Sequence, residues 1–420
     1  MDKLIPRLAE ARLNQLMRVF RVVVVNGPRQ AGKTTLLQMY AERQGGEMIS
    51  LDDRSKLQIA RDDPRTLIDE AERPTMIDEV QRAGDPLVLA IKYVVDRDRT
   101  RGQFIMSGST QFLTVPRISE SMAGRAAFLD LWPLAVVERV GAEPAFVDLM
   151  FTNPDALRRG RTRWTRNDYL DLITSGGYPE VLSVPRSDRR TWYDSYMRTV
   201  ISRDIVEFAQ IEHGAAVPRL LALLAARSGS ATVVADLAGD LELNQQTVRN
   251  YLSYLNGVFL TATVPPWSTN LTAKVAKAPK TFLTDAGLAA HLLTADASAL
   301  RRPEHPALGG LVETFVLTEL MKLRSISADP FEVRYFRDRG GREVDFVLER
   351  HDGLVSAIEV KATASPSSSH AANLMWLRDR VGDRFTTGIL LHQGDAVGSI
   401  GDRVQLLPVS ALWRHAALPT

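Results

Sequence analysis

The chain has 420 residues, of which 45% are hydrophobic and 24% are charged, and its formal net charge is +2. This length exceeds what one hydrophobic core usually supports, so two or three domains are expected. The absence of cysteine excludes disulfides and thiolate metal sites. No apolar run approaches the roughly 18 residues of a membrane span, and the start of the chain is typical of an amphipathic helix rather than a signal peptide. We therefore expect a cytoplasmic protein without a membrane partner.

The first part of the chain alternates short apolar runs with longer helical patterns. The runs read VVVVNG, EMISLDD, PTMIDEV, FIMSGST and FLDLWP. Short buried strands separated by helices favour a parallel sheet with helices on both faces. The sequence therefore predicts an N-terminal α/β domain over residues 1–140.

A phosphate-binding loop follows the first of these runs. It fits the pattern of glycine, four residues, glycine, lysine and threonine, and a helical pattern comes directly after it. Such a loop points backbone amides at the β and γ phosphates, while Lys33 neutralises charge and Thr34 holds Mg²⁺. We therefore expect ATP and Mg²⁺ to bind at Gly27, Pro28, Arg29, Gln30, Ala31, Gly32, Lys33, Thr34 and Thr35.

An acidic pair closes the run PTMIDEV. At the end of a strand beside the phosphate loop, Asp78 would bind Mg²⁺ through water and Glu79 would polarise the attacking water. These roles imply that ATP is hydrolysed as well as bound. The alternative is that the pair belongs to a surface turn.

The phosphate loop, MIDEVQR, FIMSGST and MAGRAAFLDLWPL together resemble the bacterial and archaeal ATPases of the AAA superfamily that carry a DUF4143-type C-terminal region. This resemblance spans nearly the whole chain. It implies that a polar residue at the end of the fourth core strand senses the γ phosphate, which maps to Ser109, with Ser107 as the second choice. It also maps Arg125 to a family position that faces nucleotide, and the alternative is that Arg125 pairs with a neighbouring acid.

Ring-forming relatives complete their nucleotide site with an arginine from the next subunit. Arg198 and Arg203, in the segment MRTVISRDI, are the candidate donors. The sequence neither chooses between them nor requires a ring, so a homo-oligomer is an open expectation.

Two regions separate the ATPase domain from the C-terminal part. Residues 141–210 have mostly helical patterns, and residues 211–300 contain two helical patterns around a break near Glu242. The second region resembles a winged helix-turn-helix with residues 244–257 as its second helix, and any helical hairpin is the alternative. A loop that contains Lys274, Lys277 and Lys280 is expected to follow.

Residues 301–420 are expected to form a separate α/β domain. The pattern is a helix over LGGLVETFVLTELMKL, strands at FEVRYFRD, REVDFVLE and LVSAIEVKA, a helix near residues 374–380 and a strand at TTGILLH. About 110 residues are enough for such a unit to fold by itself.

Acidic and lysine side chains gather on two of these strands. Side chains alternate along a strand, so Glu359 and Lys361 share a face about 6 to 7 Å apart. A hairpin through residues 351–353 would bring Asp345 beside Glu359. Adjacent carboxylates repel each other unless a cation lies between them, and hard divalent metals prefer such ligands. With Lys361 stabilising hydroxide or phosphate charge, this group suits phosphodiester hydrolysis assisted by Mg²⁺ or Mn²⁺.

The pattern of Asp345, Glu359 and Lys361 resembles the PD-(D/E)XK nuclease superfamily. This resemblance implies a restriction-endonuclease-like fold for the C-terminal domain, with Glu313 on its first helix as a further metal ligand. The proline of the family's name is absent, since Val344 precedes Asp345. Whether the site cleaves nucleic acid, or the fold is kept for binding or assembly, stays open.

These features support a leading hypothesis and two alternatives. The leading hypothesis is an Mg²⁺-dependent ATPase whose nucleotide state controls a nuclease-like C-terminal domain that acts on DNA or other nucleic acid. One alternative is an ATP-dependent assembly or binding protein with an inactive nuclease fold. The other is a DNA-binding regulator that acts through the winged helix, against which the near-neutral net charge argues.

Overall fold

The computed structural model describes residues 4–109, 122–200, 216–268, 278–327 and 329–418. The chain forms two compact units, Met1–Pro133 with Gly257–Phe259, and Leu134–Asn256 with Leu260–Thr420. The finer division at residues 140, 210 and 300 stays a prediction. Within the described part of the chain, no helix is both long enough and apolar enough to cross a membrane.

A parallel sheet forms the centre of the first unit. Its strands are β1 (Val22–Asn26), β2 (Glu47–Ser50), β3 (Thr75–Asp78), β4 (Phe104–Gly108) and β5 (Ala126–Asp130), in the order β2-β3-β4-β1-β5. All of these pairings are parallel, so the carboxyl ends of the strands meet at one edge. The apolar runs of the sequence are therefore the strands of a parallel sheet, as predicted.

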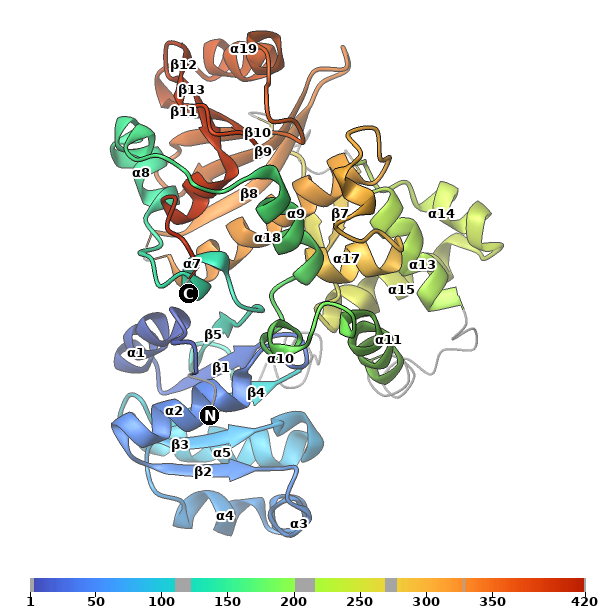
Figure 1. Ribbon diagram of the computed structural model, residues 1–420. Helices are drawn as coiled ribbons and strands as arrows, with labels where there is room; N and C mark the ends of the chain where they lie inside the picture. The colour runs from blue at the N-terminus through green and yellow to red at the C-terminus, as the bar shows by residue number, and fades with distance from the viewer. Residues whose placement is uncertain (1–3, 110–121, 201–215, 269–277, 328, 419–420) are drawn as a thin grey trace. The chain divides into compact units, whose positions relative to one another are not determined.

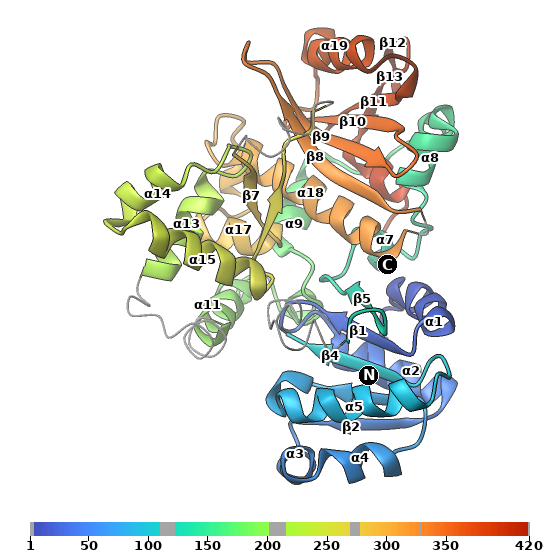
Figure 2. The same cartoon turned by 180° about the vertical axis from the view of Figure 1, so that it is seen from behind.

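Helices cover both faces of this sheet. Helix α2 (Lys33–Gln44) lies on the face seen in Figure 1, and α5 (Asp85–Arg97) lies on the face seen in Figure 2. The remaining helices are α1 (Ala9–Val19), α3 (Arg54–Asp62) and α4 (Pro64–Glu70). On the α5 side, Ile91 belongs to the same buried cluster as Val24 of β1 and Met106 of β4.

The second unit begins with helical segments, as the sequence predicted. They are α7 (Val136–Arg139), α8 (Phe146–Thr152), α9 (Arg166–Ser175), α10 (Pro179–Ser183) and α11 (Arg189–Thr199). Further on come α13 (Ala216–Ala226), α14 (Val234–Leu241), α15 (Gln245–Gly257), the hairpin of β6 (Thr261–Val264) with β7 (Lys280–Leu283), and α17 (Ala286–Leu292). Glu242 ends α14 in the left-handed conformation, with φ of 57°. The break between the two helices thus lies where it was expected, and the winged-helix assignment stays a prediction.

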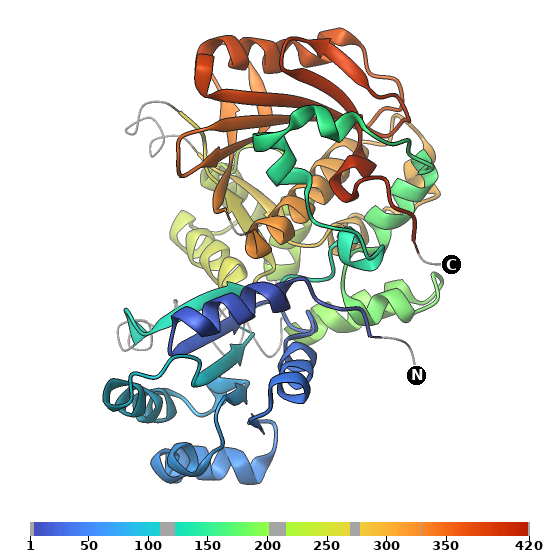
Figure 3. The same ribbon diagram turned by 90° about the vertical axis from the view of Figure 1, so that its left-hand side faces the viewer.

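A mixed sheet forms the C-terminal part of the second unit. Its order is β12-β13-β11-β10-β9-β8, from β8 (Phe331–Arg337), β9 (Glu343–Arg350), β10 (Val355–Lys361), β11 (Phe385–His392), β12 (Gly398–Gly401) and β13 (Val404–Pro408). Strands β8, β9 and β10 form antiparallel pairs, whereas β10, β11 and β13 run parallel. Helix α18 (Leu308–Ile326) precedes the sheet, and α19 (Ala372–Val381) lies along it (Figure 3). Strands β12 and β13 were not predicted.

A buried lysine joins three elements of the second unit. Lys280, the first residue of β7, is 1% exposed. Its ammonium lies 3.1 Å from Glu313 Oε1 of α18 and 2.6 Å from Glu343 Oε1 of β9. The expectation that Lys280 belongs to a loop is therefore wrong. A lysine can start a buried strand here because carboxylates replace the water that its charge would otherwise require.

We expect Lys280→Met to lower the free energy of unfolding of the second unit by about 3 kcal/mol, because Glu313 loses its cation in a largely water-excluded site. Urea denaturation followed by tryptophan fluorescence measures mainly this unit. Of the six tryptophans, Trp132 alone belongs to the first unit.

The matched control is Arg324→Met, which removes an exposed ion pair with Glu332 at 2.8 Å and a hydrogen bond to the carbonyl oxygen of Phe331 at 2.9 Å. We expect it to change the free energy of unfolding by less than about 1 kcal/mol. Adding Glu313→Gln to Lys280→Met is expected to restore part of the lost stability, because one unpaired charge is removed as well. Equal losses for Lys280→Met and Arg324→Met would contradict the structural role of Lys280.

Candidate functional site

The phosphate loop connects the carboxyl end of β1 to α2. Residues 27–32 form the loop, and Lys33, Thr34 and Thr35 begin the helix. A β-carbon on Gly27 would lie 2.1 Å from the carbonyl oxygen of Leu131, and Gly32 has φ of 92°. Both positions therefore require glycine. The helix that follows has 12 residues, and its N-terminus, where backbone amides can bind an anion, lies at the carboxyl ends of the strands.

Two cationic side chains hold the phosphate loop from inside the protein. The ammonium of Lys33 donates to the carbonyl oxygens of Gly27 and Pro28, each at 2.9 Å. The guanidinium of Arg7 donates to the carbonyl oxygen of Ala31 at 2.6 Å and to that of Trp132 at 2.7 Å. Sequence reasoning missed Arg7, because a single arginine near the start of the chain carries no local signal.

Asp78 lies beside the loop at the end of β3 and is 1% exposed. The hydroxyl of Thr34 donates to Asp78 Oδ2 at 2.7 Å, and the hydroxyl of Ser107 donates to the other carboxylate oxygen. The structure thus brings together the two residues that were predicted to hold Mg²⁺. Ser107 contacts Asp78, which the sequence did not anticipate.

Glu79 follows Asp78 with a left-handed backbone, at φ of 57°. For a residue other than glycine this conformation costs about 1–3 kcal/mol and is concentrated at functional sites. Burial raises the pKa of the Glu79 carboxyl, and the charge of Lys33 opposes the rise. The amide of Gln81 donates to Glu79 Oε2 at 2.5 Å and to the hydroxyl of Ser109 at 3.2 Å. Gln81, which was not predicted, therefore connects Glu79 to the expected phosphate sensor.

Arg125 lies at the amino ends of the strands, whereas the phosphate loop lies at their carboxyl ends. It precedes β5, and its carbonyl oxygen accepts a hydrogen bond from the amide of Val22, the first residue of β1. Its guanidinium donates to both carboxylate oxygens of Asp96, one of them at 3.0 Å. Hydrogen bonds from Arg125 and Lys92 lower the pKa of Asp96 to about 2.

Because β1 and β5 are parallel, the full length of these strands separates Arg125 from the phosphate loop of its own chain. Within its own chain Arg125 pairs with a neighbouring acid, which is the alternative that the sequence left open, and a role of Arg125 toward nucleotide in a neighbouring subunit stays a prediction. Of the candidate arginine donors, Arg198 is exposed in the last turn of α11. Arg203 lies outside the described residues. A role for either one in a neighbouring subunit stays a prediction.

The acidic residues of the C-terminal part meet where β9 and β10 pair. The antiparallel register places Ile358 opposite Phe346, which puts Glu359 next to Asp345. Asp345 Oδ2 accepts a hydrogen bond from the backbone amide of Val360 at 2.8 Å. Lys361 donates to Glu359 Oε1 at 2.6 Å. The hairpin therefore assembles the three residues that the sequence singled out.

The acidic group consists of Glu313, Asp345 and Glu359, and it has more buried carboxylates than its two lysines, Lys280 and Lys361, can neutralise. Burial raises the pKa of Glu359 and of Glu313, and repulsion from Asp345 adds to both shifts. Burial likewise raises the pKa of Asp345. Among the residues described, Glu359 Oε2 is buried and has no hydrogen-bond partner. An unpartnered carboxylate oxygen beside a second carboxylate is an arrangement that a hard cation satisfies.

Glu313 reaches this group but is engaged by Lys280. Burial disfavours the ammonium of Lys280, yet Glu313 and Asp345 raise its pKa overall, so the pair is strongly held. No three or more His, Cys, Asp or Glu side chains within the described ranges are arranged to hold a metal ion. Lys280 thus occupies one oxygen of Glu313, and the role of Glu313 as a further metal ligand stays a prediction. Lys280 directly precedes apolar residues in the run KTFL, which indicates that it belongs to a buried strand. The prediction of a loop did not take this signal into account.

Comparison with protein families divides the chain into three matched regions. Residues 19–140 match the family described as AAA domain. Residues 166–299 match a domain of unknown function, DUF8612, and residues 308–412 match the domain of unknown function DUF4143. The first and last matches contain the phosphate loop and the acidic group, respectively.

Two solved structures align at low identity. The Walker-type ATPase PABY2304 of Pyrococcus abyssi is 13% identical, with a TM-score of 0.41, and the alignment covers 69% of this chain and 96% of that one. AMPPCP-bound DnaA from Aquifex aeolicus is 14% identical, with a TM-score of 0.29, over 59% of this chain and 86% of that one. Neither likeness defines the fold of the whole chain.

Two mycobacterial proteins are more similar in sequence. The chain is 30% identical over 367 residues to the uncharacterized protein Rv2008c of Mycobacterium tuberculosis and to the uncharacterized protein Mb2031c of Mycobacterium bovis. Each alignment covers 87% of this chain and 76% of the relative. The chain therefore belongs to the same family as these mycobacterial proteins, and it carries an AAA domain with a phosphate loop and a DUF4143 domain.

Proposed function

We propose that the first unit binds ATP with Mg²⁺ and hydrolyses it. The observation that carries this proposal is the 2.7 Å hydrogen bond between Thr34 Oγ1 and Asp78 Oδ2 at the base of the phosphate loop. Both are hard oxygen donors of the kind that Mg²⁺ prefers. When bound, Mg²⁺ would neutralise the charge that develops on the β and γ phosphates.

The surrounding residues supply the remaining functions. Glu79, whose carboxyl has a raised pKa, accepts a proton from the attacking water more readily than an ordinary carboxylate does. Lys33 is held over the loop and exchanges its bonds to Gly27 and Pro28 for bonds to phosphate. Ser109 reports the γ phosphate to Glu79 through Gln81.

We expect Glu79→Gln to keep ATP binding and to slow hydrolysis by about 10²–10⁴-fold, because the amide cannot take a proton from water. Lys33→Ala is expected to lose ATP binding itself. Equilibrium binding of labelled ATP and single-turnover hydrolysis separate the two effects.

Glu70→Gln is the control for this pair, since Glu70 is an exposed carboxylate of the same unit. It is expected to leave both measurements unchanged. Hydrolysis at the wild-type rate in Glu79→Gln would assign the general base to another residue.

A second candidate function is metal-dependent hydrolysis of phosphodiesters at the acidic group of the C-terminal part. The observation that favours it is the unpartnered Glu359 Oε2 beside Asp345, with Lys361 at 2.6 Å from the other oxygen of Glu359. A divalent ion held by Asp345 and Glu359 would supply an activated water. Because Lys280 engages Glu313, we propose a single ion at this site.

The order of elements also supports a restriction-endonuclease-like domain, since α18 is followed by β8, β9, β10, α19 and β11. Nucleotide would control this domain if ATP and ADP make different contacts with the first unit. The alternatives are assembly without cleavage, and DNA binding through α15. The latter helix exposes polar residues that suit a nucleic-acid surface, namely Gln245, Gln246, Arg249 and Asn250.

We expect Asp345→Asn to abolish cleavage with Mg²⁺ or Mn²⁺ and to leave ATP hydrolysis intact, because it removes one of two metal ligands and touches only the C-terminal part. Linear, circular and single-stranded DNA and RNA are the substrates, each with and without ATP. Calorimetry on the Lys33→Ala chain is expected to find one ion, which is lost when Asp345→Asn is added.

Glu332→Gln, which changes an exposed carboxylate on β8, is the matched control. Undamaged substrates together with normal ATP hydrolysis would favour the assembly function. Sequence-specific DNA binding that Arg249→Ala weakens would instead favour the regulator.

A further inference from the structure

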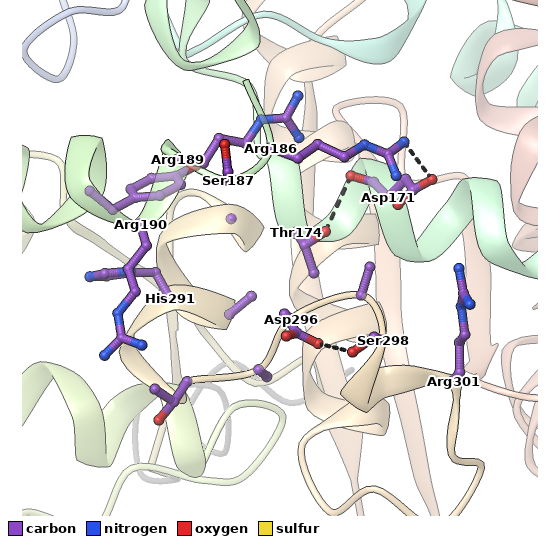
Figure 4. Close-up of a pocket in the computed structure, with 16 residues that line it drawn as sticks. Asp171, Thr174, Arg186, Ser187, Arg189, Arg190, His291, Asp296, Ser298 and Arg301 are labelled. Carbon is purple, nitrogen blue, oxygen red and sulfur yellow. Dashed lines mark hydrogen bonds and ion pairs between the residues drawn. The ribbon is translucent and has the colours of Figure 1, made fainter. Parts of the chain in front are cut away.

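A cavity of about 550 Å³ lies within the second unit (Figure 4). Its walls come from α9, the start of α11, α17 and the segment that leads to the short helix η5 (Ala299–Arg301). The volume falls in the range of about 300–1,000 Å³ that is typical of small-molecule sites. No residue of the phosphate loop or of the acidic group lines it. This cavity is therefore separate from both proposed catalytic sites.

The floor of the cavity is rigid and uncharged. It contains the ring of Tyr193 and the small residues Gly287, Ala290 and Ala295. The Tyr193 hydroxyl donates to Asp285 Oδ1 and to the carbonyl oxygen of Ser175, each at 3.1 Å, and these bonds fix the ring. Gly287 leaves space for this hydroxyl, because a β-carbon there would lie 2.3 Å from it. His291, which also lines the cavity, stacks on the Tyr193 ring with 5.4 Å between the ring centroids, so an uncharged group would rest against this pair of rings and the small residues beside them.

The rim of the cavity is cationic. It includes Arg186, Arg189, Arg190 and Arg301. Arg186 pairs with Asp171 at 2.8 Å, so one of the two lining carboxylates is already neutralised. The other, Asp296, is engaged in accepting hydrogen bonds from Ser298 and Ala299.

Two of the rim arginines have donors to spare. Within the part of the chain that the structure describes, no hydrogen bond or ion pair engages the guanidinium of Arg190 or of Arg301. Figure 4 shows them on opposite sides of the floor, Arg190 beside His291 and Arg301 near Asp296 and Ser298. A ligand that lies on the floor would meet unpaired guanidinium groups at its edges.

We propose that this cavity binds a small phosphorylated molecule, with its phosphate on the arginine rim and its uncharged part on the floor. The planar fork of a guanidinium matches phosphate oxygens and forms charge-assisted hydrogen bonds with them. The apolar floor favours a ligand with an organic body over a bare inorganic ion. A nucleic-acid chain would need an extended groove that follows its backbone, whereas this site is a single cavity that ends at the floor described above.

The test uses the full chain with Lys33→Ala, so that the phosphate loop does not compete for the probe. Calorimetry compares AMP, pyrophosphate and adenosine. We expect AMP to bind saturably with one site per chain, pyrophosphate to bind more weakly, and adenosine not to bind. Adding Arg190→Ala or Arg301→Ala is expected to weaken AMP binding by about tenfold each, the typical loss for one charged hydrogen bond.

Arg302→Ala is the matched control, because Arg302 is exposed, adjacent to Arg301 and does not line the cavity. It is expected to leave AMP binding unchanged. The proposal is overturned if neither AMP nor pyrophosphate binds saturably, or if Arg302→Ala weakens binding as much as Arg301→Ala. It is also overturned if a short single-stranded oligonucleotide binds in an Arg190-dependent manner while AMP does not.

Discussion

The buried ammonium of Lys280 is the contact on which the second unit depends. A lysine without partners would not be stable inside this unit, and Glu313 without Lys280 would be an unpaired carboxylate in a largely buried place. Each charge is tolerated only because the others are present. Strand β7, helix α18 and strand β9 must therefore come within hydrogen-bond distance before the acidic group exists. Since β9 carries both Glu343 and Asp345, the same contact also fixes where the proposed metal ligands lie.

The two proposed catalytic sites are organised by different physical means. Backbone geometry builds the phosphate loop: Gly27 passes against Leu131, Gly32 turns the chain, and the loop carbonyls hold Lys33. Ion pairs between buried side chains build the acidic group, where burial and repulsion from Asp345 raise the pKa of Glu313 and of Glu359 and each of these two pairs with a lysine. The first site tolerates few changes of backbone, and the second tolerates few changes of charge.

Local patterns in the sequence were sufficient for much of this. The strands of the first sheet, the phosphate loop and Asp78 all follow from short apolar runs and one glycine-rich motif. The hairpin from Asp345 to Glu359 follows from strand alternation and a turn. What local pattern could not reveal depends on partners distant in the chain: Arg7 on Ala31, Arg125 on Asp96, and Lys280 on Glu313. The rim of the cavity combines Arg190 with Arg301, and no motif spans such a separation.

The position of Lys280 has a consequence for how this protein can be divided. The DUF4143 match starts at residue 308, beyond Lys280, which belongs to the preceding DUF8612 match. A fragment cut at that family boundary would carry Glu313 without Lys280, its ion-pair partner. Its acidic group would then recruit protons or stray metal ions from the buffer, so metal affinities measured on such a fragment would describe a site that the intact chain does not contain. The functional boundary of the C-terminal part thus lies upstream of the boundary drawn by sequence families.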